Sequence, residues 1–414
     1  MTDTPHTGFD QQAYAARLKK RYASEQRFRF YGVTALVLTT AFLAYLLVDI
    51  VRKGWPAFFE HTATINVMID PAKIDASDPG KSNFDELVKT TWRAQFPDLT
   101  SRADKKAVGS LLSQSAADDL RAMVIADPAL IGKTVSTKVL LSDDADLYLK
   151  GISSDLDVAL MERVTKSMPI ETGFAWRFFT NGDSREPELA GLWGALVGSL
   201  FTVGIALSLG IPLGIGAAIY LEEFAPRNRW TDVIEVNINN LAAVPSIIFG
   251  LLGLAMFLNV FGLPRSAPLV GGLVLALLVL PTIIIASRAA LRAVPPSIKE
   301  AALGVGASHQ QAVFQHVVPL ATPGILTGII LGLARTFGET APLLMIGMVA
   351  FIADIPGGIT DAATVLPVQI YLWSDLPELA FQSKTAAAIL VLVGTLLCLN
   401  GIAIYLRRKF ERRW

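Results

Sequence analysis

The sequence predicts an all-α polytopic membrane protein of six transmembrane helices, with a small mixed α/β domain inserted after the first helix. Three observations support this fold class. First, 52% of the 414 residues are hydrophobic, which is high for a soluble protein. Second, the apolar residues gather in runs of about 20 residues or more, long enough to cross a bilayer as helices. Third, these runs lack the alternation of apolar and polar residues that a transmembrane β-barrel needs.

The chain begins with a polar, basic segment, residues 1–30, which we expect in the cytoplasm. An apolar run follows from Tyr31 to Val51 and ends at Arg52 and Lys53. A cleaved signal peptide would have a shorter apolar core and a cleavage site of small residues. We therefore expect residues 31–53 to form an uncleaved first transmembrane helix.

Residues 54–188 are polar and charge-rich, and their length suits one small folded domain on the outer side of the membrane. Helical periodicity occurs around residues 101–126 and 154–166, and we expect a short strand at residues 138–141.

Two fragments of this domain have part of the pattern of a phosphate-binding loop, Gly80-Lys81-Ser82 and Gly132-Lys133-Thr134. The pattern requires an earlier glycine five positions before, where this chain has Asp75 and Asp127. Both fragments are chance matches, so we do not expect this chain to bind and hydrolyse ATP by that route.

Five further apolar runs follow in residues 189–414, and each can satisfy its backbone in lipid as a helix. They cover residues 192–220, 238–261, 269–290, 324–351 and 385–406. The N-terminal segment and the C-terminal tail from Arg407 to Trp414 are both basic. Because Lys and Arg concentrate on the cytoplasmic side and an even number of spans returns the chain to that side, we expect both termini in the cytoplasm.

The composition excludes several kinds of site. The formal net charge is zero, so it gives no indication of nucleic acid or of another charged partner. Cys398 is the only cysteine, and the four histidines lack a metal-binding spacing. We therefore expect no disulfide within the chain, no metal and no cofactor.

A polar loop at residues 295–319 separates two of the apolar runs. It contains two spacings typical of helix starts, with two glycines between them that permit a sharp turn. The spacings are Ser297 with Glu300 and Ser308 with Gln311, and the glycines are Gly304 and Gly306. We expect two short helices joined by a bend in the cytoplasm; an ordinary amphipathic connector is the alternative.

The fifth of the six runs carries charged residues at membrane depth. Arg335 lies about 12 residues from its cytoplasmic start, roughly 18 Å deep at helical rise and near the bilayer midplane. Arg335 and Glu339 are four residues apart, on one helix face, and Thr336 and Thr340 flank them with hydroxyls. Charges there are costly and usually face a cavity or a partner.

We hypothesise that Arg335 pairs with Glu339 when the cavity is empty and turns its guanidinium fork to an oxyanion that enters. Glu339 would then accept the O–H of a partly protonated anion. The alternative is a permanent interhelical ion pair that only holds the helices together.

Prolines interrupt three other runs, at Pro212, Pro245 and Pro281, and bend or open the helix by removing a hydrogen bond. Ser246 and Thr282 follow two of them. Their hydroxyls either face the solute or bond to the carbonyls that the prolines free. Three glycines of the second run are expected to permit close helix packing, and these are Gly210, Gly214 and Gly216.

In the loop, Glu300-Ala301-Ala302 followed by Gly306 resembles the EAA motif of ABC importer permeases. In that family the loop forms coupling helices that sit in a groove of an ATPase subunit and carry its closure to the membrane helices. His316 and Val318 depart from the motif, since they stand near where an isoleucine and a leucine are usual. The resemblance implies that Glu300, Ala301, Ala302 and Gly306 couple this chain to an ATPase.

Further stretches resemble the permeases of phosphate importers. They are residues 198–200 with 219–224, residues 244–250, residues 280–284 and the Arg335 to Leu344 segment. Residues 366–371 resemble the A-type (PstA) permease rather than its C-type partner. The resemblance covers about residues 190–414 and the first span, whereas residues 54–188 look like an extra N-terminal domain of some bacterial members.

This resemblance implies a type I ABC importer permease fold in a bacterial inner membrane. The implied partners are a homologous C-type permease, two ATPase subunits and a periplasmic phosphate-binding protein. The implied solute is inorganic phosphate, which is moved without chemical change, so the chain is not expected to be an enzyme. A permease for sulfate or molybdate is the nearest alternative; a membrane sensor or scaffold and a passive channel are further ones.

Overall fold

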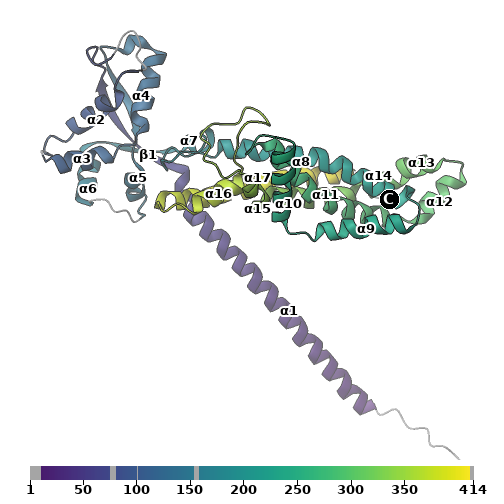
Figure 1. The fold of residues 1–414 in the computed structure, drawn as a ribbon. Coiled ribbons are helices and arrows are strands. Elements are labelled where there is room, and N and C mark those ends of the chain that lie inside the picture. The colour runs from purple at the N-terminus through teal and green to yellow at the C-terminus, as the bar shows by residue number, and fades with distance from the viewer. Residues whose placement is uncertain (1–10, 75–80, 100, 153–157, 411–414) are drawn as a thin grey trace, which may run out of the picture. The chain divides into compact units, whose positions relative to one another are not determined.

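The computed structural model describes residues 11–74, 81–99, 101–152 and 158–410. Within them the chain is mostly helical and has one small sheet, which confirms the predicted fold class (Figure 1). Five helices are long and apolar enough to cross a membrane, or six if one bent pair counts as a single span. The chain divides into two units after Lys53.

The first unit contains helix α1, Gln11–Gly54, except for its last residue, and this helix is exposed along almost its whole described length. The helix begins well before the predicted span at residue 31. The preceding basic segment is rich in Ala, Lys, Arg, Glu and Gln, which have high helix propensity and therefore continue the helix.

The second unit opens with a short 3-10 turn, Trp55–Phe58, and a three-stranded antiparallel sheet of order β2-β1-β3. The strands are β1 Phe59–Met68, β2 Thr134–Leu140 and β3 Ile170–Phe174. The pairing sets Thr64 opposite Lys138 and Thr62 opposite Glu171. The predicted strand at residues 138–141 is confirmed as part of β2, which begins four residues earlier.

Helices cover this sheet and bury its core. They are α2 Phe84–Ala94, α3 Arg102–Ser110, α4 Ser115–Ala126, α5 Asp143–Leu149 and α6 Val158–Ser167, with a 3-10 turn at Pro128–Leu130. The core includes Phe84, Trp92 and Met161, which are fully buried. The helical region predicted at residues 101–126 is two helices. The region predicted at residues 154–166 corresponds to α6, and its residues 154–157 lie outside the described residues.

Of the two rejected phosphate-loop fragments, the one at residues 80–82 precedes α2, and only its residues Lys81 and Ser82 are described. Gly80 and Asp75 lie outside the described residues. Gly132 has a φ of 85° in the turn before β2, so a strand follows it where a phosphate-binding loop would be followed by a helix.

The remaining helices form the apolar part of the second unit. They are α7 Trp176–Thr180, α8 Trp193–Ile219, α9 Arg229–Ala242, α10 Ser246–Gly253, α11 Pro268–Arg292, α12 Pro296–Gly304, α13 His309–Gln311, α14 Val318–Gly338, α15 Ala341–Met345, α16 Leu366–Ser374 and α17 Leu379–Phe410. Wider π-helical turns follow α8 at Tyr220–Phe224, α10 at Leu254–Val260 and α13 at Ala312–Val317.

Two of the predicted spans are wrong as single continuous helices. The run at residues 238–261 is bent by 100° between α9 and α10. Pro245 lies at this bend, where it lacks an N–H donor and disfavours helical backbone at Val244. The run at residues 324–351 is broken after Gly338 and is helical again only in the short α15, because Pro342 cannot supply the next helical hydrogen bond to the Gly338 carbonyl.

Close packing of α8 on α11 is confirmed at two of the three glycines that were predicted to permit it. A Cβ at Gly210 would lie 2.9 Å from Val279 Cγ1, and one at Gly214 would lie 2.7 Å from Ile283 Cγ2. The prediction is wrong for Gly216, where a Cβ would meet no atom within 4 Å. Pro212 and Pro281 both lie inside these two helices, which continue past them.

Candidate translocation and coupling sites

Arg335 lies in the last turn of α14, and its guanidinium is held only loosely. Its Nε is 3.5 Å from Glu339 Oε1, and its Nη1 is 3.4 Å from Thr282 Oγ1 in α11. Both distances are at the outer limit for a hydrogen bond. The side chain is 37% exposed, so a group with five N–H donors makes only these two long contacts to described residues.

Glu339 lies beyond the end of α14, with extended backbone, instead of one turn further along the same helix. Its carboxylate is 19% exposed and lines a small cavity with Ser199 and Thr202 of α8. The Thr202 hydroxyl is buried and has no hydrogen-bond partner among the described residues. Ser199 accepts a 2.8 Å hydrogen bond from the backbone N–H of Leu366. Neither α8 residue was predicted, although both belong to an apolar run in which hydroxyls are rare.

The other predicted pathway residues are less closely grouped. The Thr336 hydroxyl is buried and donates a hydrogen bond of 2.7 Å to the Gly332 carbonyl of its own helix. Thr336 also lines the cavity beside Glu339. Thr340 is half-buried and is the N-cap residue directly before α15. Ser246 begins α10 beside the 100° bend and has no side-chain hydrogen bond among the described residues. The structure therefore brings together Arg335, Glu339 and Thr282, with Thr336 on the cavity wall.

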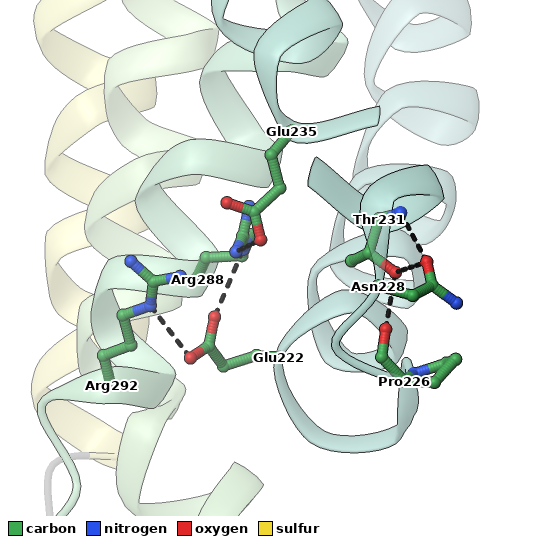
Figure 2. Close-up of polar contacts among 7 residues, drawn as sticks. All are labelled: Glu222, Pro226, Asn228, Thr231, Glu235, Arg288 and Arg292. Atoms are coloured by element: carbon green, nitrogen blue, oxygen red, sulfur yellow. Dashed lines mark hydrogen bonds and ion pairs between the residues drawn. The ribbon is translucent and has the colours of Figure 1, made fainter. Parts of the chain in front are cut away.

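A second arginine, Arg288 of α11, shows by contrast what a closed ion-pair network looks like (Figure 2). Its Nε donates a hydrogen bond of 3.2 Å to Glu222 Oε2, and its Nη2 donates a second one to Glu235 Oε1 of α9. Arg292, one turn further along α11, donates 2.8 Å to the other oxygen of Glu222. Only 11% of the Arg288 side chain is exposed. None of these ion-pair partners was predicted from the sequence.

The polar loop at residues 295–319 contains two short helices with a bend, as predicted. The capping box is confirmed at the second helix, where Gln311 N donates 3.3 Å to Ser308 Oγ and Ser308 N donates 2.8 Å to Gln311 Oε1. Gly306 makes the bend with a φ of 89°, a conformation that glycine adopts readily. Gly304 instead ends α12.

The capping box predicted at Ser297 and Glu300 is wrong. Helix α12 begins one residue before Ser297, at Pro296, with Pro295 as its N-cap and no side-chain cap. Proline suits the first helical position because its fixed φ is already helical and no N–H is needed there. The two prolines therefore start the helix, and Ser297 lies inside its first turn.

Specific contacts attach this loop to the end of α8. Lys299 Nζ donates a hydrogen bond of 2.6 Å to Glu223 Oε2, and the Glu223 side chain is only 9% exposed. His309 Nε2 lies 2.9 Å from the Glu223 carbonyl oxygen, and its ring contacts Phe224 at 5.0 Å between centroids. The loop is therefore fixed to the membrane helices at both of its short helices.

The residues of the EAA-like motif divide between the two faces of α12. Ala302 is buried, whereas Glu300, Ala301 and Gly306 are exposed. The Glu300 carboxylate forms no ion pair or hydrogen bond with the described residues. Val305, at the end of α12, is 87% exposed. An exposed apolar side chain and a free carboxylate in one short segment give a surface suited to a protein partner.

A third polar cluster lies where the small domain meets α17. Burial raises the pKa of the Glu60, Asp143 and Glu188 carboxyls, which line one cavity there. Lys384 of α17 lines the same cavity and donates 2.6 Å to the Ala190 carbonyl. The cavity therefore gathers more carboxylates than cations in a largely buried place.

Two family models match the chain. Residues 210–413 match the model described as "Binding-protein-dependent transport system inner membrane component", and residues 15–158 match a "Domain of unknown function (DUF3333)". The first match contains both the polar loop and Arg335.

Several curated proteins are similar to this chain. The phosphate transport system permease protein PstA 1 of Mycobacterium tuberculosis (strain CDC 1551 / Oshkosh) is 33% identical over 238 residues, which is 58% of this chain and 77% of that protein. PstA of Haemophilus influenzae is 30% identical over 254 residues, 61% of this chain and 86% of that protein. PstC of the same organism is 36% identical over 175 residues, 36% of this chain and 55% of that protein.

A solved structure, an inward-facing conformation of the MetNI methionine ABC transporter, is similar at 17% identity with a TM-score of 0.41. The match covers 54% of this chain and 95% of that one.

Proposed function

This chain belongs to the family of phosphate transport system permease proteins, and we propose that it forms part of the membrane pathway by which an ATP-driven importer brings inorganic phosphate into the cytoplasm. It is a multi-pass membrane protein and a transport subunit, not an enzyme. The observation that carries the proposal is the loosely held guanidinium of Arg335.

An arginine that serves only to hold helices together is expected to be closely paired, as Arg288 is. Arg335 has one carboxylate at 3.5 Å and one hydroxyl at 3.4 Å, and its side chain is 37% exposed. A tetrahedral oxyanion entering beside it can take two of the remaining N–H donors in a bidentate arrangement. This geometry favours an exchangeable partner over the permanent ion pair.

Glu339 supplies selectivity in this proposal. A fully deprotonated anion such as sulfate would meet the Glu339 carboxylate as an unfavourable like charge at short range. A phosphate that carries a proton can donate its O–H to that carboxylate and form a charge-assisted hydrogen bond. Thr282, which already contacts Arg335, can orient the same anion, and Thr336, Thr340 and Ser246 complete the proposed pathway.

Uptake of the solute requires energy, which we expect another subunit to provide by hydrolysing ATP. We assign the exposed face of α12 and the Gly306 turn, with Glu300 and Ala301, as the surface that receives an ATPase subunit. Ala302 packs α12 inward, and Lys299 and His309 attach the loop to the end of α8. A displacement of the loop is therefore passed to α8 and to α14, which begins directly after it.

The proposed assembly contains this chain, a homologous C-type permease, two ATPase subunits and a periplasmic phosphate-binding protein, in a bacterial inner membrane. Both termini and the residue 295–319 loop lie in the cytoplasm, with residues 54–188 as a periplasmic domain. The basic C-terminal end of α17, Arg407 to Lys409, supports this orientation.

The proposal is tested by measuring uptake of radiolabelled phosphate and assembly of the complex separately in cells. Arg335→Gln is expected to abolish uptake while the chain still co-purifies with a second permease and an ATPase. Arg288→Gln is the matched control, which is expected to reduce the amount of assembled complex. Normal uptake by the assembled Arg335→Gln complex would overturn the proposed role.

A further inference from the structure

Four aromatic residues form a continuous series on the surface where the small domain joins the membrane helices. Ring centroids are 5.8 Å apart between Trp55 and Phe59, 6.3 Å between Phe59 and Phe174, and 4.8 Å between Phe174 and Trp176. We call these four residues the aromatic patch. Trp55 is 59% exposed, Phe174 40% and Trp176 69%.

The patch is backed by buried rings that fix its position. Phe174 stacks on Phe179 at 5.7 Å, and Phe179 contacts Phe178 at 5.2 Å. Phe178 is 1% exposed and packs against Trp373 of α16 at 6.4 Å. The inner rings thus belong to the protein core, whereas the outer rings present an apolar face that no described residue covers.

The patch is close in sequence to the ends of two long apolar helices, α1 and α8. Trp55 directly follows α1, which ends at Gly54, and a Cβ on Gly54 would lie 2.7 Å from the backbone N of Ala387 in α17. On the other side, Leu192 N, next to the start of α8, donates 2.8 Å to the Phe178 carbonyl. The aromatic patch is therefore within a few residues of points where the chain enters or leaves the apolar region.

We propose that the aromatic patch is seated in the boundary between headgroups and acyl chains of the bilayer, and holds the small domain against the lipid surface. Tryptophan concentrates at this depth because its ring is apolar while its indole N–H bonds to water or headgroups. The indole N–H groups of Trp55 and Trp176 have no hydrogen-bond partner among the described residues. Arg52, shortly before the patch in sequence, lies at a helix end, where a long basic side chain extends to the level of the headgroups.

This inference needs only that the long apolar helices span a membrane, so it can fail or hold independently of phosphate transport. The test uses the full chain in lipid nanodiscs with a Cys398→Ser background and one fluorescent label. Thr180→Cys places the label one helical turn after Trp176 in α7, on the same helix face and without removing a ring. Met68→Cys is the matched control, 59% exposed at the opposite end of β1 from Phe59, roughly 30 Å away along the strand.

Lipids carrying a nitroxide near the headgroup are expected to quench the label at position 180 several-fold more strongly than the label at position 68. Adding Trp55→Ser and Trp176→Ser should reduce that quenching towards the level of the control, while circular dichroism shows that the domain remains folded. Equal weak quenching at both positions would overturn the proposal. Quenching at position 180 that disappears when the second permease is present would also overturn it, because a protein surface would then cover the patch.

Discussion

Arg335 Nε and Glu339 Oε1 lie 3.5 Å apart although the two residues belong to different backbone segments, one in the last turn of α14 and one beyond its end. If Glu339 lay on the next turn of the same helix, the helix backbone would keep its carboxylate at a fixed position relative to Arg335. Here the helix stops at Gly338, so Glu339 is held by the segment that leads into α15 and by the cavity on α8. The two groups can therefore separate when an anion enters.

Glu339→Gln is expected to change the selectivity between phosphate and sulfate more than the rate of phosphate uptake. The amide keeps the size of the side chain but removes the charge that repels a fully deprotonated anion. Sulfate should then inhibit phosphate uptake several-fold more strongly than in the unmodified transporter, as measured by competition uptake. Unchanged weak inhibition by sulfate would show that Glu339 does not contribute to discrimination.

Glu300→Ala is expected to abolish uptake without reducing the amount of protein in the membrane. Its carboxylate is exposed and contacts no other described group, so its removal should leave this chain stable. Asp98→Ala removes an exposed carboxylate in the small domain and serves as the control. Uptake that survives Glu300→Ala would favour a sensor, scaffold or passive channel over an ATP-coupled permease.

Reversing the Lys299–Glu223 pair tests whether the loop is attached to α8 by charge. Lys299→Glu alone brings two carboxylates together at a site where Glu223 is 9% exposed, and should uncouple ATP hydrolysis from uptake. Lys299→Glu combined with Glu223→Lys should restore coupling, with an interaction energy of about 0.5–3 kcal/mol in a double-mutant cycle. Additive defects in the double variant would contradict this role.

Glu188→Gln is expected to stabilise the small domain at neutral pH. Because burial raises the pKa of the Glu188 carboxyl above its ordinary value of 4.5, the folded state holds this proton to a higher pH than the unfolded chain. The contribution of Glu188 to the free energy of unfolding therefore falls as pH rises from about 4.5 through the raised pKa, and is constant above it.

Thermal unfolding of the detergent-solubilised chain checks this prediction. The variant should unfold at a higher temperature than the unmodified chain at neutral pH, and the difference should vanish below pH 4.5. Glu162→Gln, an exposed carboxylate of α6, is the control and should show no such pH-dependent gain. A gain from Glu188→Gln that is the same at both pH values would arise from packing and not from the charge.

The fold class could be predicted because long apolar runs follow directly from the requirement to satisfy the backbone in lipid. Where those runs break could not be predicted so well. Pro212 and Pro281 lie inside helices that continue, whereas Pro245 and Pro342 lie at breaks, and only the surrounding packing distinguishes the two cases. Strand β1 was missed, although Ala63, Ile65 and Val67 alternate with polar residues as a half-buried strand should.

Local spacing predicted only part of the candidate site, because the capping box expected at Ser297 and Glu300 is absent and Glu339 lies beyond the end of α14. Arg335 and Glu339 are four residues apart, and Ser308 and Gln311 form the expected capping box. Contacts between segments far apart in the sequence leave no comparable spacing pattern in the sequence. Arg288 meets Glu222 across 66 residues and Glu235 across 53 residues, and only the packing of α8, α9 and α11 brings them together.

We propose that the Arg335 guanidinium binds the transported anion. This binding is tested most directly by reconstituting the complete assembled transporter with Arg335→Gln in proteoliposomes and measuring phosphate uptake and ATP hydrolysis together. We expect an intact complex that hydrolyses ATP when the binding protein is present but accumulates almost no phosphate. Accumulation at the rate of the unmodified transporter, with the same ratio of phosphate to ATP, would contradict it.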